Sequence, residues 1–183
     1  MKKLPLRLLG TLLFATLFIA CSDDDDTDTE VVENNGQRNL EITMEFLEGF
    51  EREDPAIFEV FSEDYIGFNR FNPSGSQEPI ILPNAQAQID FFNTIFQVFD
   101  NISFDEERFT ISEDGNSIFF QAISDGWTFV PTGAPYNQVY VFRLDFNEAG
   151  EVTTIEEYIN WVINSEVAQV PLGSCQQVLC QNQ

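Results

Sequence analysis

The chain has 183 residues, the length of one ordinary domain with short appendages. Its 8 basic and 31 acidic residues give a formal net charge of −23, so no basic stripe can form against phosphates and no nucleic-acid partner is expected. Histidine is absent, which excludes His-dependent triads and His-ligated metal sites, and neither a metal nor a cofactor is expected. The hydrophobic content of 43%, with 19 Phe, is sufficient for a folded core.

Residues 1–20 have the pattern of a secretory signal. A basic start that includes Lys2 and Arg7 precedes an apolar run over 8–20, which is too short to favour a spanning helix of ~20 residues. The stretch Leu17-Phe18-Ile19-Ala20-Cys21 resembles a bacterial lipoprotein lipobox. That resemblance implies that Cys21 is acylated and that the protein is attached to a membrane through its N-terminal lipid. The alternative is a plain secreted protein in which Cys21 is incidental.

Residues 22–37 are strongly acidic. Seven of them are Asp or Glu and none is basic, so the like charges repel and predict an extended, disordered tether. The Ser-Asp-Asp-Asp-Asp run over 22–26 resembles the surface-export signal of lipoproteins in Bacteroidetes-type bacteria. The resemblance implies an outer-membrane lipoprotein displayed on the cell surface. The alternative is a solvated spacer on a lipoprotein that faces the periplasm.

The folded domain is expected over 38–163 and begins with helices. Apolar residues at spacings of three and four predict an amphipathic helix over 38–53. Asp54 followed by Pro55 is typical of a cap and first helical position, which predicts a short second helix that ends at 61. Asn84 caps a third helix that continues to 99. Between the second and third helices, a strand is expected over 64–71 and a loop over 72–83.

The remainder of the domain is strand-like. Asp114-Gly115 is a strong hairpin signal, and further turns are expected at 131–135 and 148–150. Helices followed by an antiparallel meander indicate an α+β fold. The four strands are expected over 102–112, 117–129, 136–146 and 152–162.

A polar tail over 164–183 follows the last strand and contains Cys175 and Cys180. An exported protein meets an oxidising compartment, and with Cys21 acylated these two are the only free thiols. The sequence therefore predicts a Cys175–Cys180 disulfide that closes a short loop. The alternative is two unpaired thiols.

The order of elements over 38–161 resembles the SnoaL-like branch of the nuclear transport factor 2-like superfamily. The segments that carry the resemblance are Glu51-Arg52-Glu53-Asp54, 57–65, 131–135, 146–152 and Glu157-Tyr158-Ile159-Asn160. The resemblance implies three N-terminal helices packed in a strongly curved, mainly antiparallel sheet that forms a cone (cystatin-like) with one apolar pocket. It also implies a homodimer, because many members dimerise through the sheet.

Enzymes of that superfamily use carboxylates in the apolar cone, where burial raises the pKa of the acid and suits it to proton transfer. Many members place an Asp at the end of the last strand, but this chain has Asn160, and an amide transfers no proton at neutral pH. Glu157 is the remaining catalytic candidate, on a face shared with Ile155 and Ile159. The opposite parity would instead place Thr154, Glu156, Tyr158 and Asn160 inside the cone.

Aromatic residues supply the other candidates for a site. Together with Glu157, the predicted ligand-binding residues are Tyr65, Trp127 and Trp161, and Tyr136 is a further candidate for the pocket mouth, where such rings can stack on a cyclic ligand. Arg70 and Arg143 lie within strands, and cross-strand pairing with a carboxylate is favoured there over an anion site.

Two functional hypotheses follow. The first is a membrane-anchored module that binds a small, largely apolar ligand without catalysis, which the lack of His and the surface tether favour. The second is a small-molecule enzyme of the cyclase, isomerase or hydratase type that uses a pocket carboxylate. Two polar groups directed at one point would favour the enzyme, and a purely apolar pocket would favour binding.

Overall fold

The computed structural model describes residues 26–171, with side chains from residue 35 onward. The signal over 1–20, the acylation site Cys21 and the Cys175–Cys180 pair lie outside the described residues and stay predictions. The helices and strands are α1 (Asp26–Glu51), the 3-10 helix η1 (Pro55–Val60), β1 (Phe61–Asn69), β2 (Ile80–Leu82), α2 (Ala85–Val98), β3 (Phe99–Asp100), β4 (Phe104–Ile111), β5 (Ser117–Ser124), β6 (Trp127–Phe129), β7 (Ala134–Tyr136), β8 (Val139–Phe146), β9 (Val152–Glu157) and α3 (Trp161–Ala168).

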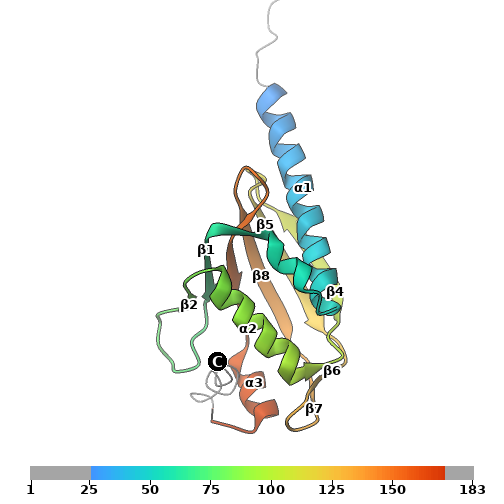
Figure 1. Cartoon of the computed structure of the whole chain (residues 1–183), viewed down its shortest axis with the longest axis vertical. Coiled ribbons are helices and arrows are strands. Elements are labelled where there is room, and N and C mark those ends of the chain that lie inside the picture. The colour runs from blue at the N-terminus through green and yellow to red at the C-terminus, as the bar shows by residue number, and fades with distance from the viewer. Residues whose placement is uncertain (1–25, 172–183) are drawn as a thin grey trace, which may run out of the picture.

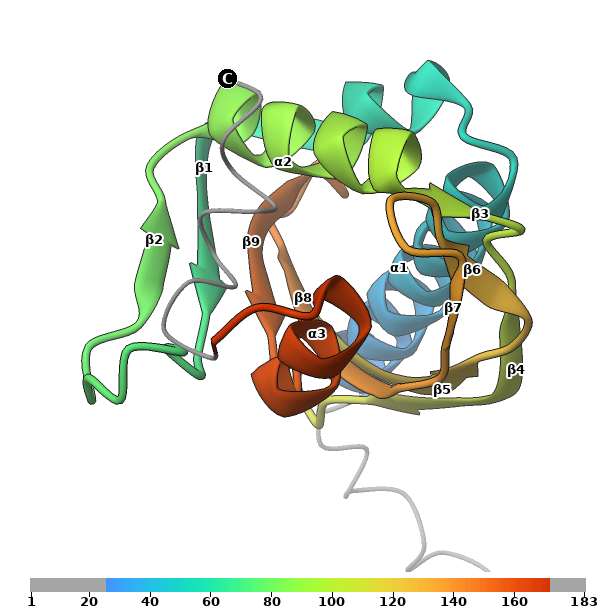
Figure 2. The same ribbon diagram turned by 90° about the horizontal axis from the view of Figure 1, so that it is seen from below.

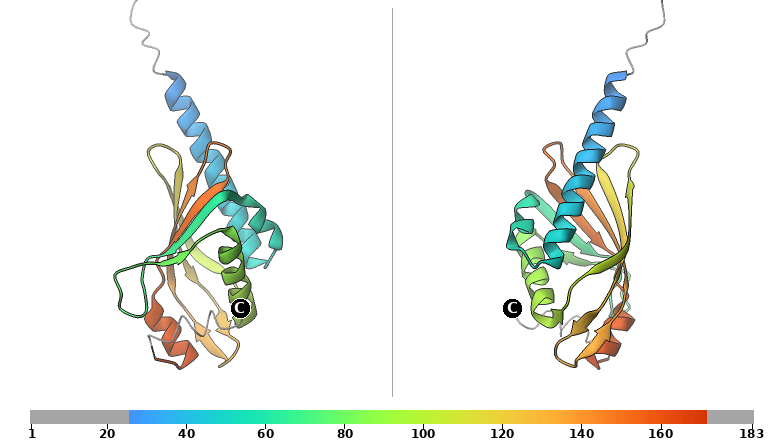
Figure 3. Two further views of the ribbon diagram at one scale, coloured as in Figure 1. Left: turned by 60° about the vertical axis from the view of Figure 1, so that its left-hand side comes forward. Right: turned by 90° about the vertical axis from the view of Figure 1, so that its right-hand side faces the viewer.

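A six-stranded sheet in the order β2-β1-β9-β8-β5-β4 forms the body of the domain. Every neighbouring pair is antiparallel except β1 with β9, which is parallel. The sheet is strongly curved, and α1 and α2 lie on its concave side (Figure 3). A second sheet, β3-β6-β7, and the helix α3 lie at the end opposite the start of α1 (Figure 1). The predicted α+β fold with helices in a curved, mainly antiparallel sheet is confirmed.

Helix α1 is longer than the sequence pattern predicts. It begins at Asp26 rather than near 38, so the expectation of an extended tether over 22–37 is wrong from Asp26 on. The helix packs closely on the strands near residue 38: a Cβ on Gly36 would lie 2.8 Å from Cγ2 of Ile111, and Nδ2 of Asn39 donates to the Gly115 carbonyl at 2.9 Å. The hairpin between β4 and β5 therefore packs against the helix around residues 36–39. Within 26–171, no helix is long and apolar enough to cross a membrane.

The predicted caps and the hairpin are present. Oδ1 of Asp54 accepts a backbone N–H two residues on at 2.9 Å, and Pro55 opens η1. The Asn84 side chain accepts a backbone N–H three residues on at 2.9 Å and begins α2. At the predicted hairpin, Gly115 has a φ of 71°, a conformation that favours glycine, and β4 pairs with β5. Local side-chain chemistry thus sets three element boundaries.

Three predicted strands and one predicted loop differ from the structure. The strand expected over 136–146 is divided between the end of β7 and β8, and the loop expected over 72–83 contains β2. The strand expected over 117–129 is two strands, because Gly126 turns the chain between β5 and β6 with a φ of 74°. The strand expected over 152–162 ends at Glu157, and α3 follows it. The side chain of Asn160 accepts the Val162 N–H at 3.1 Å and so begins a helix where a strand was expected.

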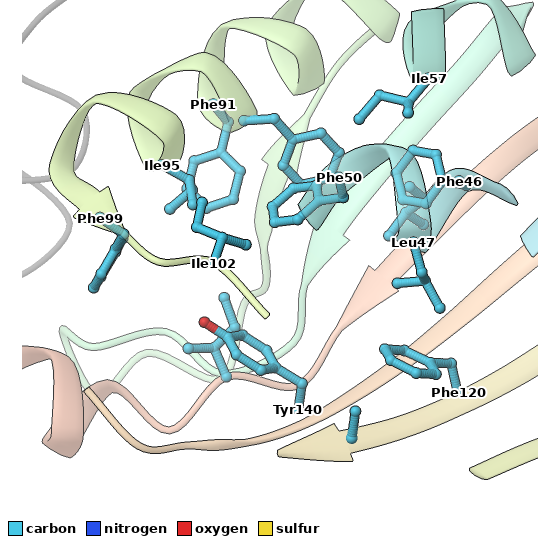
Figure 4. Close-up of a cluster of buried hydrophobic side chains, with 14 of the residues drawn as sticks. Phe46, Leu47, Phe50, Ile57, Phe91, Ile95, Phe99, Ile102, Phe120 and Tyr140 are labelled. Atoms are coloured by element: carbon cyan, nitrogen blue, oxygen red, sulfur yellow. The ribbon is translucent and has the colours of Figure 1, made fainter. Parts of the chain in front are cut away.

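The core fills the concavity with aromatic side chains. Phe50 of α1 makes edge-to-face contacts with two Phe residues of α2, with ring centroids 5.1 Å and 4.9 Å away. Figure 4 shows Leu47 of α1 facing Phe120 of β5, and Phe46 of α1 beside Ile57 of η1. Edge-to-face ring packing of this kind adds to the stabilisation from burial. The 19 Phe residues noted in the sequence are therefore used largely to fill the cone.

Candidate functional site

A cavity of about 30 Å³ lies inside the cone, between α2, the sheet and α3. Its walls are mostly aromatic and include Phe91, Trp127 and Phe142. The polar side chains among its lining residues are Glu157, Tyr136, Tyr140 and Asn164. The volume of this cavity exceeds the ~10–15 Å³ that one water molecule needs. A ligand larger than water would have to displace aromatic side chains. Figures 1 and 2 show α2 and α3 at the end of the domain where β6 and β7 lie, opposite the start of α1.

Glu157 is the acidic group of this cavity. It ends β9, where it pairs with Phe142 of β8 and with Asn69 of β1, so its position is fixed from both sides. Only 3% of the residue is exposed. Burial raises the pKa of the carboxyl to about 8, and a hydrogen bond from Gln88 opposes part of that rise. At neutral pH the group is therefore mainly a neutral carboxylic acid that can donate a hydrogen bond.

Gln88 connects Glu157 to the opposite wall. Nε2 of Gln88 donates to Oε1 of Glu157 at 3.2 Å, and Oε1 of Gln88 accepts from the Tyr65 hydroxyl at 2.8 Å. Gly67 makes room for this pair, because a Cβ there would lie 2.5 Å from Oε1 of Gln88 and 2.9 Å from the Tyr65 oxygen. The backbone of β1 and the first half of α2 thus hold the amide that orients Glu157.

A second polar group of the cavity is centred on Tyr136. Its hydroxyl donates to Oδ1 of Asn164 at 2.8 Å and accepts from Nε2 of Gln138 at 2.8 Å. The hydroxyls of Tyr136 and Tyr140 are 2.9 Å apart. Burial raises the pKa of Tyr140, and the hydrogen bond with the Tyr136 hydroxyl opposes part of that rise. The Tyr140 hydroxyl therefore remains protonated at neutral pH.

The parity of the last strand, left open by the sequence, is resolved. Glu157 and Ile159 line the cavity, and Ile155 packs in the core on the same face. Glu156 lies on the outer face, where it forms a hydrogen-bonded ion pair with Arg70 and accepts the Tyr158 hydroxyl. Those contacts lower the pKa of Glu156, with the Arg70 hydrogen bond as the largest cause. Adjacent glutamates thus have opposite environments.

The arginines are paired rather than directed into the cavity. Arg70 pairs across strands, from the end of β1 to Glu156 of β9, as the sequence predicts. Nε of Arg143 donates to Asp145 at 2.8 Å, which is a pairing along its own strand and not across strands. In the described part of the chain, no group of three or more His, Cys, Asp or Glu side chains is arranged to hold a metal ion.

Some of the predicted ligand-binding residues line the cavity, and others do not. Trp127 and Glu157 line the cavity, and so does Tyr136. Tyr65 is buried one step behind Glu157, through Gln88. Trp161 is not among the lining residues, and its indole N–H donates to the Phe71 carbonyl and so attaches α3 to the end of β1. Ligand contact by these residues stays a prediction.

The sequence did not single out Tyr140, Asn164 or Gln88 as site residues. Tyr140 could have been found, because the alternation Tyr136, Gln138, Tyr140 places all three on one strand face. Asn164 carried no such signal, since it was assigned to the tail and lies instead on the unpredicted helix α3. Asn160 is exposed and caps α3, so its amide does not stand in for a cavity acid.

Comparisons with known proteins identify the fold. No family model matches the chain, and no curated protein matches it. Similar solved structures include a candidate isomerase from Bacillus subtilis (TM-score 0.65, 20% identity, 74% of this chain and 95% of that one) and a candidate polyketide cyclase from Xanthomonas campestris (0.59, 18%, 74% and 98%). A third is an NTF2-like protein from Burkholderia xenovorans (0.57, 18%, 72% and 95%). The domain therefore has the NTF2-like fold, as the resemblance seen in the sequence implies.

Proposed function

We propose that the domain binds a small, neutral, largely apolar molecule in the cone and that Glu157 donates a hydrogen bond to an oxygen atom of that molecule. The observation that carries this proposal is a buried carboxyl, neutral at pH 7, in a cavity with otherwise mostly aromatic walls. Such sites place a few polar groups in an apolar pocket to fix the orientation of the ligand. The excess of acidic residues disfavours anions before they reach the cavity.

Cyclohexanone is a suitable first probe, because it combines an apolar ring with one oxygen acceptor. The full chain carrying Cys21→Ala, which lacks the acylation site, is compared with the same chain carrying Glu157→Gln or Glu157→Leu. Ketone binding should weaken as the pH rises from 6 to 9.5 in the parent, because the carboxyl loses its proton. Gln retains a donor at all pH values and should remove this dependence, and Leu should remove most of the binding.

Thermal shift and titration calorimetry measure these effects. Glu156→Gln is the matched control, because it changes the neighbouring acid on the outer face and should leave ketone binding unchanged. Equal responses of the parent and the Glu157→Leu variant would exclude Glu157 from the site. No binding by any variant at any pH would contradict the proposal as a whole.

A second candidate function is proton transfer at carbon, as in an isomerase or a cyclase. The observation that favours it is that Glu157 and the hydroxyls of Tyr136 and Tyr140 line one cavity. An acid with a pKa near 8 is well matched to proton transfer at neutral pH, and hydroxyl donors can stabilise an enolate oxygen. Exchange of the hydrogens next to the cyclohexanone carbonyl in D₂O, followed by NMR, tests this. Exchange no faster than in the Glu157→Gln variant would leave binding as the function.

The location of the protein is a separate proposal, based on the sequence. We propose that Cys21 carries the lipid of an outer-membrane lipoprotein, with the domain at the cell surface. Cys21→Ala should then move the protein from the membrane fraction to the soluble fraction. Protease added to intact cells should cleave a surface protein, and protection of the chain would instead indicate the periplasmic face.

Dimerisation through the outer face of the sheet also stays a proposal. Phe119 and Val139 on that face are 41% and 50% exposed. Sedimentation of the full chain carrying Cys21→Ala tests it, and introducing Asp at position 119 should shift a dimer toward the monomer. A monomer at all concentrations would contradict the proposal.

A further inference from the structure

A second cavity of about 20 Å³ lies beside the first, under α1. Among the described residues, all of its lining side chains are apolar, and Leu47, Phe120, Leu144 and Ile155 belong to this cavity alone. Figure 4 shows Leu47 and Phe120 facing each other, to one side of Tyr140. Among the described residues, the cone therefore contains one cavity with polar groups and, beside it, another whose lining is apolar.

Four phenylalanines line both cavities and separate them: Phe50, Phe92, Phe104 and Phe142. Phe142 lies between the two spaces, because its ring stacks on Tyr140 of the first at 5.4 Å and on Phe120 of the second at 5.9 Å. It keeps a partly exposed side chain, although Tyr140 and Leu144 on the same face of β8 are buried. Phe142 is therefore the ring that a ligand would have to displace to pass from one cavity to the other.

The strands show how the two cavities are placed relative to each other. Along β8, Tyr140 lines only the first cavity, Phe142 lines both and Leu144 lines only the second. On β9, Glu157 pairs with Phe142, and Ile155 pairs with Leu144. Two residues along a strand span roughly 7 Å. The cavities therefore follow one another along β8, with the carboxyl at one end.

We infer that the ligand is an elongated molecule with one polar oxygen at Glu157 and an unbranched apolar tail that lies along β8 and enters the second cavity. This inference rests on the proposed function of the first cavity and adds the class of ligand. Phe142 is the side chain that determines the length of tail accepted, since its ring must turn to join the two spaces. A compact ligand would leave the second cavity empty.

A series of straight-chain methyl ketones, from 2-butanone through 2-heptanone to 2-undecanone, tests the inference on the full chain carrying Cys21→Ala. Each methylene that enters the second cavity should tighten binding by up to about fourfold, the factor that corresponds to ~0.8 kcal/mol per buried methylene. Leu144→Phe fills the second cavity, so it should remove this gain and leave the dissociation constant of 2-butanone unchanged. Ile123→Phe, on the outer face of β5, is the matched control and should behave as the parent.

Phe142→Leu provides an independent test, because it replaces the ring between the two cavities with a smaller side chain. It should increase the affinity gained for each added methylene, whether or not Leu144→Phe folds. If 2-butanone binds in a Glu157-dependent manner but affinity does not rise with chain length in the parent or in the Phe142→Leu variant, the elongated ligand is refuted and the proposed function stands. If no ketone of any length shows Glu157-dependent binding, the proposed function itself fails.

Discussion

Replacing Glu157 by Gln should change how the stability of the domain depends on pH. The folded state raises the pKa of this carboxyl from its ordinary 4.5 to about 8, because burial disfavours the charged form. Between these two values the unfolded chain releases a proton that the folded chain retains. The free energy of unfolding should therefore fall as the pH rises from about 4.5 to about 8, and Gln, which does not titrate, removes this contribution.

The size of the effect follows from the pKa difference. Each pKa unit corresponds to 1.36 kcal/mol, so the rise from 4.5 to about 8 amounts to roughly 4–5 kcal/mol once the pH exceeds 8. At pH 4.5 and below, both states are protonated and the contribution to stability is fully retained. The Glu157→Gln variant should thus be close to the parent in stability at acid pH and more stable than the parent at pH 9.

Urea unfolding from pH 4 to 9 measures this difference directly. The other carboxyls titrate equally in both proteins, so the difference between the two curves isolates Glu157. Glu156→Gln is a control of opposite sign: the folded-state pKa of Glu156 is lowered, so its contribution is present at neutral pH and is lost as the pH falls below about 4.5. Parallel curves for the parent and the Glu157→Gln variant between pH 5 and 8 would refute the assignment of a neutral buried acid.

Two further predictions come from the structure and a third from the sequence. Gly67→Ala should displace Gln88, because Oε1 of Gln88 would lie 2.5 Å from the new Cβ. The variant should lose about 1–3 kcal/mol of unfolding free energy in urea and bind the ketone more weakly. An unchanged unfolding free energy and unchanged binding would contradict this prediction. Tyr136→Phe should cost about 1–3 kcal/mol in the same assay, because it leaves buried donors and acceptors without their hydroxyl partner, and a neutral result would contradict the network. Thiol labelling of the exported protein without reductant should leave Cys175 and Cys180 unmodified, and two labelled thiols would exclude the predicted disulfide.

Much of the fold could be predicted from local signals. Asp54-Pro55, Asn84 and Asp114-Gly115 are short-range capping and turn signals, and all three fall where the structure uses them. The start of α1 could not be found this way, since the acidic residues suggested a repelling tether. The helix also contacts a hairpin about 75 residues away in the sequence, as in the hydrogen bond from Asn39 to Gly115, which no local pattern reveals.

The site was predicted in part for a related reason. Periodicity placed Glu157 among apolar neighbours on one strand face, but it could not decide between the two parities, because a shift of one residue exchanges the faces. Pairing of Glu157 with Phe142 and of Glu156 with Arg70 resolves that choice. Gln88 and Asn164 come from helices distant in the sequence, and no pattern along a single element could have assigned them to the cavity.

The pH titration of the Glu157 carboxyl carbon tests the central claim most directly. In the full chain carrying Cys21→Ala and carbon-13-labelled glutamate, the resonance that Glu157→Gln removes should titrate near pH 8. Saturating ketone should move its midpoint upward, since a ligand that accepts a hydrogen bond from the neutral acid stabilises the protonated form. A midpoint near 4.5, unchanged by any ketone, would contradict both the buried neutral carboxyl and its role as the group that holds the ligand.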